Sequence, residues 1–135
     1  METDKIKHLE FIQNIITRMN SNSFTIKGWM ITIVSALLAI YASNSNETFI
    51  FVAIFPVVVF WFLDAYYLTQ ERKFRKLYDA VVDDKISHVF SMKHNENTVC
   101  YFEVLWSPTI GWLYIPVIVA LLIGGLILNE TILIQ

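Results

Sequence analysis

Cysteine and charged residues are scarce in this chain, and each shortage excludes a class of protein. Cys100 is the only cysteine among 135 residues, so no disulfide can form within the chain. We expect it to be reduced and partly buried. Only 16% of the residues are charged and 56% are hydrophobic, whereas a soluble domain has about 25% charged residues. The composition therefore predicts an integral membrane protein. The net charge of −2 is uninformative by itself, and nothing in the sequence suggests a nucleic-acid surface.

The motifs of catalysis are also missing. The sequence has no nucleophile–base pair, no Gly-rich phosphate loop and no paired carboxylates in a plausible cleft. His8, His88 and His94 do not have metal-site spacing with Cys100, and we expect them to be solvated. Charges throughout the first twenty residues argue against a cleavable signal peptide. We therefore expect no enzyme, no cofactor and no metal site.

Three apolar blocks account for the excess of hydrophobic residues. They predict membrane-spanning helices at 26–43, 48–68 and 107–128 in a single integral membrane domain. The second block has about 21 residues, which gives roughly 30 Å of helix, the thickness of a bilayer's hydrocarbon core. Pro56 and Pro116 predict kinks inside two of these helices, and Gly124–Gly125 permits close helix contact. The fold class is therefore all-α with three transmembrane helices.

The second span has no stop signal and continues as a helix to about residue 84. Glu71 and Arg75 have the spacing of a helical ion pair. One apolar stripe runs along this extension through Phe74, Leu77, Tyr78 and Val81.

The segments that flank the spans are less regular. Residues 4–20 form an amphipathic helix that either lies in the membrane interface or packs on a partner helix. Residues 20–23 (NSNS) predict a polar break, with Ser23 as the N-cap of the next helix. Residues 85–106 fit a hairpin or two short interfacial helices, with a turn at 94–97.

Basic residues are confined to two stretches, which predicts the orientation. All ten lie at or before the start of the first span or between the second and third: Lys5, Lys7, Arg18, Lys27, Arg72, Lys73, Arg75, Lys76, Lys85 and Lys93. The positive-inside rule then places the N-terminus in the cytoplasm and the C-terminus on the periplasmic or extracellular side.

Asp64 is an acid inside the second span, where a carboxylate costs about 2.5–3.5 kcal/mol. It lies roughly 9 Å inside the boundary, at 1.5 Å per residue, and Lys27 can reach the same depth. The pair is either a structural ion pair between adjacent helices or a pore-lining or gating charge.

A stripe of small residues on the first span also has two interpretations. It comprises Gly28, Thr32, Ser35, Ala39 and Ala42. Such residues let helices approach closely, so the stripe either packs within one subunit or packs against other copies and lines a pore.

Four basic residues just beyond the second span predict contact with anionic lipid head groups. This basic cluster comprises Arg72, Lys73, Arg75 and Lys76.

Two segments carry a resemblance to known membrane proteins. HLEFIQNIITRMNSNSFTIKGWMITIVSALLA and FLDAYYLTQERKFRKLYDAV resemble a widespread group of small bacterial inner-membrane proteins, over about two thirds of the chain. The second segment is also similar in layout to SLATT-type membrane proteins, proposed pore-forming effectors in antiphage systems. No separate sensor domain is present here, which is a departure from those proteins. The resemblance implies a bacterial inner-membrane location and an effector role.

Three functions fit these observations. The first is an oligomeric pore-forming or membrane-perturbing effector, and because three spans enclose no lumen, conduction requires several copies. The second is a non-conducting scaffold or accessory subunit for a cytoplasmic partner, which would bind residues 4–20 and the stripe of Phe74, Leu77 and Val81. The third is a small proton-coupled transporter that uses Asp64, although no repeat symmetry is present.

Overall fold

The computed structural model describes residues 2–83, 85 and 99–133, and the side chains of residues 131–133 are not described. Four helices make up the regular structure of these residues: α1 (Glu2–Asn44), α2 (Thr48–Val82), α3 (Tyr101–Leu105) and α4 (Pro108–Leu133). The turn predicted at 94–97 lies outside the described residues. Residues 101–105 form one short helix in the segment for which a hairpin or two interfacial helices were expected.

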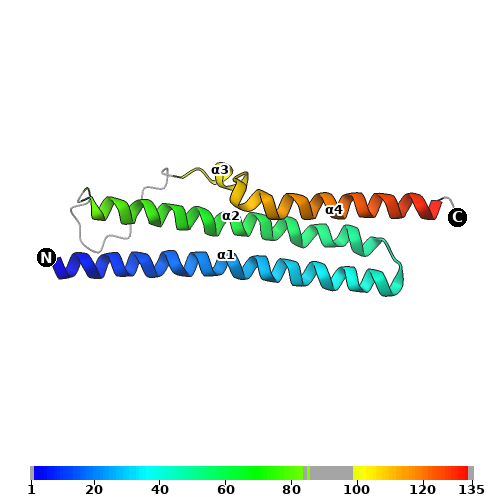
Figure 1. Ribbon diagram of the computed structural model, residues 1–135, viewed down its shortest axis with the longest axis horizontal. Coiled ribbons are helices and arrows are strands. Elements are labelled where there is room, and N and C mark those ends of the chain that lie inside the picture. The colour runs from blue at the N-terminus through cyan, green and yellow to red at the C-terminus, as the bar shows by residue number, and fades with distance from the viewer. Residues whose placement is uncertain (1, 84, 86–98, 134–135) are drawn as a thin grey trace.

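The three long helices form a flat layer (Figure 1). α2 lies between α1 and α4 and runs antiparallel to both, while the described residues of α1 and α4 have no Cα atoms within 8 Å of each other. α1 begins and α4 ends at opposite ends of the molecule (Figure 1). α1 and α2 extend well beyond α4 at one end. This extension consists of residues 2–22 of α1 and 69–82 of α2, which are the helix ends far from the connecting turn. We call it the projecting hairpin.

Three of the helices are long and apolar enough to cross a membrane. Their mean hydropathy reaches 1.7 in Glu2–Asn44, 2.2 in Thr48–Val82 and 2.4 in Pro108–Glu130. The predicted all-α membrane fold with three candidate spans is therefore confirmed. Pro56 and Pro116 lie inside continuous helices, and the kinks expected at them stay predictions.

The polar break expected at residues 20–23 is absent, because α1 is one continuous helix of 43 residues. Ser23 is a buried residue inside α1 and not an N-cap. Asn and Ser cost about 0.5–0.7 kcal/mol each in a helix relative to Ala. Packing on both sides of the break outweighs this cost, since Ile16 and Ile26 are both buried. Residues 4–20 consequently continue directly into the first candidate span and pack along α2.

Two apolar clusters hold the layer together. The larger lies between the candidate spans and includes Met30, Val57 and Tyr114. The smaller lies in the projecting hairpin, where it comprises Ile12, Ile16, Leu77 and Val81 with Leu9, Phe74 and Tyr78 packed against them. The stripe predicted along the extension of α2 therefore packs on the chain's own N-terminal residues.

The turn between α1 and α2 is short and polar. Ser45 adopts the left-handed conformation with a φ of 51°, and its N–H donates to the Tyr41 carbonyl at 2.7 Å. The Thr48 N–H donates to Asn46 Oδ1 at 3.1 Å. These bonds satisfy backbone groups left open at the helix ends.

Gly125 should be far more sensitive to substitution than Gly124. A Cβ at position 125 would lie 2.8 Å from the Phe51 ring, whereas one at 124 would meet nothing within 4 Å. Both Ala variants gain the same helix propensity, so their difference reports the clash alone. We expect Gly125→Ala to be about 1–3 kcal/mol less stable than Gly124→Ala, the usual cost of overpacking. Unfolding of both proteins in detergent, followed by tryptophan fluorescence, measures this, and equal stabilities would contradict the packing of α2 on α4.

Candidate functional site

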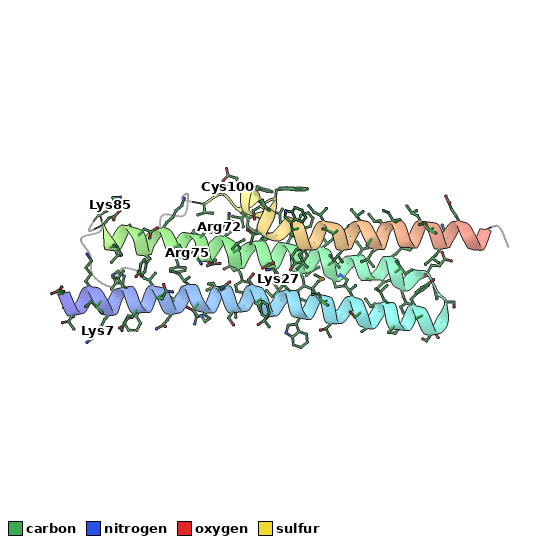
Figure 2. The ribbon with its side chains drawn as sticks, viewed as in Figure 1. Lys7, Lys27, Arg72, Arg75, Lys85 and Cys100 are labelled. Atoms are coloured by element: carbon green, nitrogen blue, oxygen red, sulfur yellow. The ribbon has the colours of Figure 1, made fainter. Side chains whose placement is uncertain are left out.

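Asp64 lies at the centre of a buried polar network that joins the helices. Its side chain is fully buried on α2, at a position that faces α1. The Lys27 ammonium lies 2.6 Å from Asp64 Oδ2, and the Lys27 side chain is 24% exposed. The predicted contact between these two residues is therefore present, and Lys27 points inward from α1 (Figure 2). Whether the pair is only structural or also gates a pore stays a prediction.

Ser23 also belongs to this network, and the sequence did not single it out as functional. Ser23 Oγ donates a hydrogen bond to Asp64 Oδ1 and accepts one from Lys27 Nζ at 2.8 Å. Ser23 and Lys27 are four residues apart, so they lie on the same face of α1. That spacing was visible in the sequence, but the expected helix break concealed it.

Tyr114 of α4 is buried near Asp64. Its side chain is fully buried, and its hydroxyl forms no hydrogen bond in the described part of the chain. The hydroxyl lies within electrostatic reach of the Asp64 carboxylate. Tyr114 lies in an otherwise apolar span, and nothing in its immediate sequence distinguished it from a core aromatic residue. The network itself comprises Ser23, Lys27 and Asp64 of α1 and α2, and Tyr114 of α4 is a buried neighbour with no hydrogen bond to it.

Several exposed aromatic side chains lie close in sequence to the network and to the start of α4. Phe24 and Trp29 flank Lys27 on α1, and Trp106 and Trp112 lie at the start of α4; all four are more than half exposed. Tryptophan favours the boundary between hydrocarbon and head groups. Exposed aromatic residues of this kind are typical of a membrane boundary, and the depth of Asp64 in a bilayer stays a prediction.

The small-residue stripe of α1 faces away from α2. Gly28, Thr32, Ser35, Ala39 and Ala42 are all exposed, and a Cβ at Gly28 would meet nothing within 4 Å. At 3.6 residues per turn, the buried residues Ile26, Met30 and Val34 lie on the opposite side of the helix. The interpretation of the stripe as a contact face within one subunit is therefore wrong.

The basic cluster is distributed around α2 and does not form one patch. Arg75 forms an ion pair of 2.7 Å with Glu71, as the spacing predicted, and points toward α1. Arg72 lies on the other side of α2 (Figure 2). Lys76 is exposed, and Arg72 and Lys73 are partly buried. Only part of the cluster can therefore face lipid head groups at one time.

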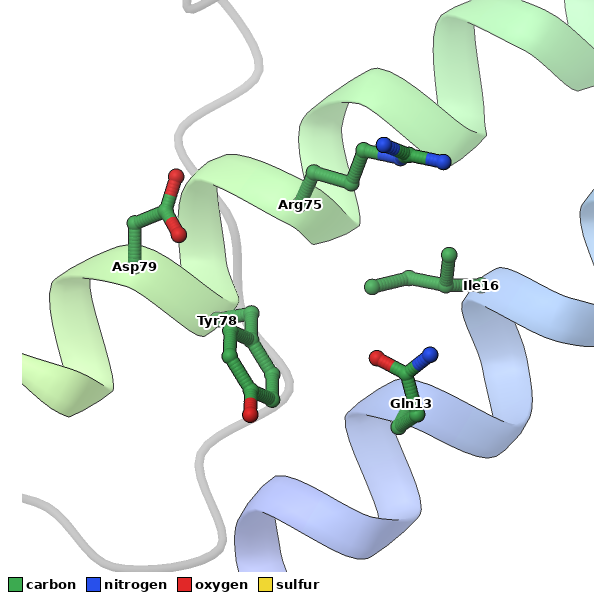
Figure 3. Close-up of a pocket in the computed structure, with 5 residues that line it drawn as sticks. All are labelled: Gln13, Ile16, Arg75, Tyr78 and Asp79. Carbon is green, nitrogen blue, oxygen red and sulfur yellow. The ribbon is translucent and has the colours of Figure 1, made fainter.

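A cavity of about 280 Å³ lies between α1 and α2 in the projecting hairpin (Figure 3). Arg75 and Tyr78 form one side, and Gln13 and Ile16 face them from α1, with Asp79 at the edge. The Arg75 charge is already balanced by Glu71. The cavity can admit a small polar molecule, and no group of three or more metal-ligating side chains lines it among the described residues.

Two minor expectations are wrong. Cys100 is exposed rather than partly buried. His8 is buried in α1 rather than solvated, and it takes part in an interaction within the protein. His88 and His94 lie outside the described residues. Among residues 2–83, 85 and 99–133, no group of three or more His, Cys, Asp or Glu side chains could hold a metal ion.

Comparison with known proteins adds no family to this description. No protein-family model, no curated protein and no solved structure matches the chain. The fold defines the class, an all-α membrane protein with three candidate spans. The resemblance to SLATT-type proteins stays a prediction.

Proposed function

We propose that this protein works in a bacterial inner membrane as a homo-oligomer whose copies together form a pore or otherwise perturb the bilayer. The small-residue stripe on α1 carries the proposal. It runs the length of the candidate span, is exposed, and lies opposite the surface that packs on α2. Helix association in lipid depends on close packing through such residues. A second copy can therefore approach α1 without disturbing the subunit.

The flat arrangement supports a role that needs several copies. Three helices in one layer enclose no channel, so any conducting path must lie between subunits. Thr32 and Ser35 would then provide hydroxyl groups along it. The Thr32 hydroxyl donates to the Gly28 carbonyl at 2.9 Å, so it can lie at a helix contact without an unsatisfied donor.

In this proposal the projecting hairpin is cytoplasmic. It holds most of the basic residues in the described part of the chain, and cationic residues favour the cytoplasmic side of spans. The turn between α1 and α2 and the end of α4 would lie on the opposite side. An antiphage role rests only on the resemblance of 62–81 to SLATT-type proteins.

The scaffold function remains the alternative. Its expected docking stripe is already occupied, because Leu77 and Val81 pack on Ile12 and Ile16. Ile6 and Phe11 are about half exposed on the projecting hairpin, and they favour binding of a cytoplasmic protein there. A transporter is less well supported, since Asp64 is paired with Lys27 and is expected near one boundary and not at the midplane.

Ser35→Leu should disrupt the assembly. A leucine in the centre of the stripe holds two helices apart, and we expect oligomer dissociation in lipid nanodiscs to increase at least about tenfold, or 1.4 kcal/mol. Mass photometry at several protein concentrations measures this. Induced expression of the native chain should depolarise cells, and Ser35→Leu should reduce that effect.

Ile40→Phe is the matched control, because Ile40 is exposed on α1 outside the stripe and the change also adds volume. It should leave both measurements unchanged. A native protein that stays monomeric in nanodiscs at all concentrations would refute the proposed function.

A further inference from the structure

The hydroxyl of Tyr114 is a buried donor that lacks an acceptor. The side chain is fully buried, and no group in the described ranges of the chain forms a hydrogen bond with its oxygen. Leaving a buried hydroxyl unpaired is costly, and a phenylalanine would fill the same space in α4 without that cost. The hydroxyl therefore indicates a second arrangement of the protein in which it has an acceptor.

The Asp64 carboxylate is an acceptor close to this hydroxyl. Trp61 Nε1 donates to the Leu105 carbonyl at 3.1 Å, which places the start of α4 beside α2, one helical turn from Asp64. A tyrosine on a helix is directed back toward the helix N-terminus, so the Tyr114 side chain extends toward this level, and its hydroxyl interacts electrostatically with the carboxylate. Each carboxylate oxygen can accept two hydrogen bonds. Asp64 therefore has acceptor capacity beyond its present partners.

Lys27 is the partner of Asp64 that can leave. Its side chain is 24% exposed, whereas the Asp64 side chain is fully buried. A lysine has a long flexible stem and can carry its ammonium toward water, while the carboxylate cannot follow. Asp64 then needs another donor, because a buried charge that has lost its partner is strongly destabilising. Tyr114 is the buried neighbour that has a hydroxyl hydrogen to donate.

We propose that Asp64 exchanges donors: when Lys27 withdraws, the Tyr114 hydroxyl donates to the Asp64 carboxylate in its place. The exchange transfers a polar contact of α2 from α1 to α4. The described residues of α1 and α4 do not approach each other within 8 Å between Cα atoms, so α2 is the element through which a displacement of α1 can reach α4. The hydroxyl replaces a hydrogen bond but not a positive charge, so the exchanged state is the less populated one. This inference does not depend on the proposed oligomer or on a pore.

Acylation of Lys27 tests the exchange in the folded full-length protein. An amine-reactive ester acylates the deprotonated amine, which Lys27 presents only after it has left Asp64, and mass spectrometry reports the rate at each lysine. Tyr114→Phe removes the alternative donor, so Lys27 should react about fivefold more slowly, the value of one hydrogen bond. Lys7, which is exposed on the projecting hairpin, is the internal control and should react equally in both proteins. An unchanged or faster reaction of Lys27 in Tyr114→Phe would overturn the proposal.

A double-mutant cycle tests the same contact through unfolding in detergent. In the native chain, Tyr114→Phe should change the folding equilibrium constant by no more than about twofold, because the hydroxyl has no partner to lose. In Lys27→Met the hydroxyl is the replacement donor, so Tyr114→Phe should lower the constant at least about tenfold, or 1.4 kcal/mol. Tyr41→Phe, in a residue packed against the larger apolar cluster, is the control and should have the same effect in both backgrounds. Equal effects of Tyr114→Phe in the two backgrounds would contradict the exchange, and the acylation experiment decides the question without Lys27→Met.

Discussion

Replacing Lys27 with methionine should destabilise the protein more than neutralising Asp64. Lys27→Met leaves a fully buried carboxylate with Ser23 as its remaining partner. Breaking a buried pair in this way costs about 3–5 kcal/mol, because the orphaned charge has lost its compensation. Asp64→Asn leaves the lysine instead. Lys27 is partly exposed, so its ammonium can move toward water along its flexible stem, and we expect a smaller cost of about 1–3 kcal/mol.

The measurement is unfolding of each variant in detergent, followed by tryptophan fluorescence. Lys7→Met is the control, since Lys7 is exposed on the projecting hairpin, and it should change stability by no more than about 0.5 kcal/mol. The double variant Lys27→Met/Asp64→Leu removes both charges, and it should recover part of the loss. An order in which Asp64→Asn is the less stable single variant would refute this asymmetry.

Leu77→Ala should open the projecting hairpin while the spans stay intact. Leu77 is buried against Ile12 and Ile16, and truncating a buried leucine costs about 2–5 kcal/mol. The smaller apolar cluster and polar contacts such as the hydrogen bond from Lys5 Nζ to the Val82 carbonyl at 3.2 Å hold the hairpin, so the loss falls on a local unit. Hydrogen exchange of the backbone amides should accelerate by at least about thirtyfold in residues 2–22 and 69–82 at that cost.

Val82→Ala provides the matched control for this experiment. Val82 lies on the same helix, but its side chain is about half exposed, so its truncation should leave the exchange rates nearly unchanged. Equal acceleration in the candidate spans would show that the hairpin and the spans unfold as one unit.

The length of α2 and the contact between α1 and α2 could be predicted from simple patterns in the sequence. The apolar run from Thr48 and the amphipathic stripe beyond it predicted the full length of α2, including its end near Asp83. The contact between Lys27 and Asp64 followed from depth and charge alone, since each ion requires a partner in a span. Close contact was predicted at Gly124–Gly125; it is present at Gly125 and absent at Gly124, where an added Cβ would meet nothing within 4 Å.

The errors arose where local propensity and tertiary packing disagree. Asn20 and Ser21 favour turns in isolation, but buried residues on either side keep α1 helical. The direction of the small-residue stripe could not be inferred, because small residues serve contacts within and between subunits equally well. Tyr114 was overlooked for a related reason. Its role depends on which helix packs beside α4, and an apolar helix without charges does not specify its neighbour.

The unbroken course of α1 has a mechanical consequence. Its 43 residues give a rod of about 65 Å at 1.5 Å per residue, with no internal joint at which bending could be absorbed. Residues 2–25, roughly half of that length, lie before the span predicted at 26–43 and pack on α2, so a tilt of this half about Lys27 would carry the end of α2 with it. A tilt of about 10° at the pivot would displace the tip by about 6 Å, estimated from this rise. Because α1 is continuous, a displacement of its N-terminal end would rotate the part of α1 that forms the candidate span.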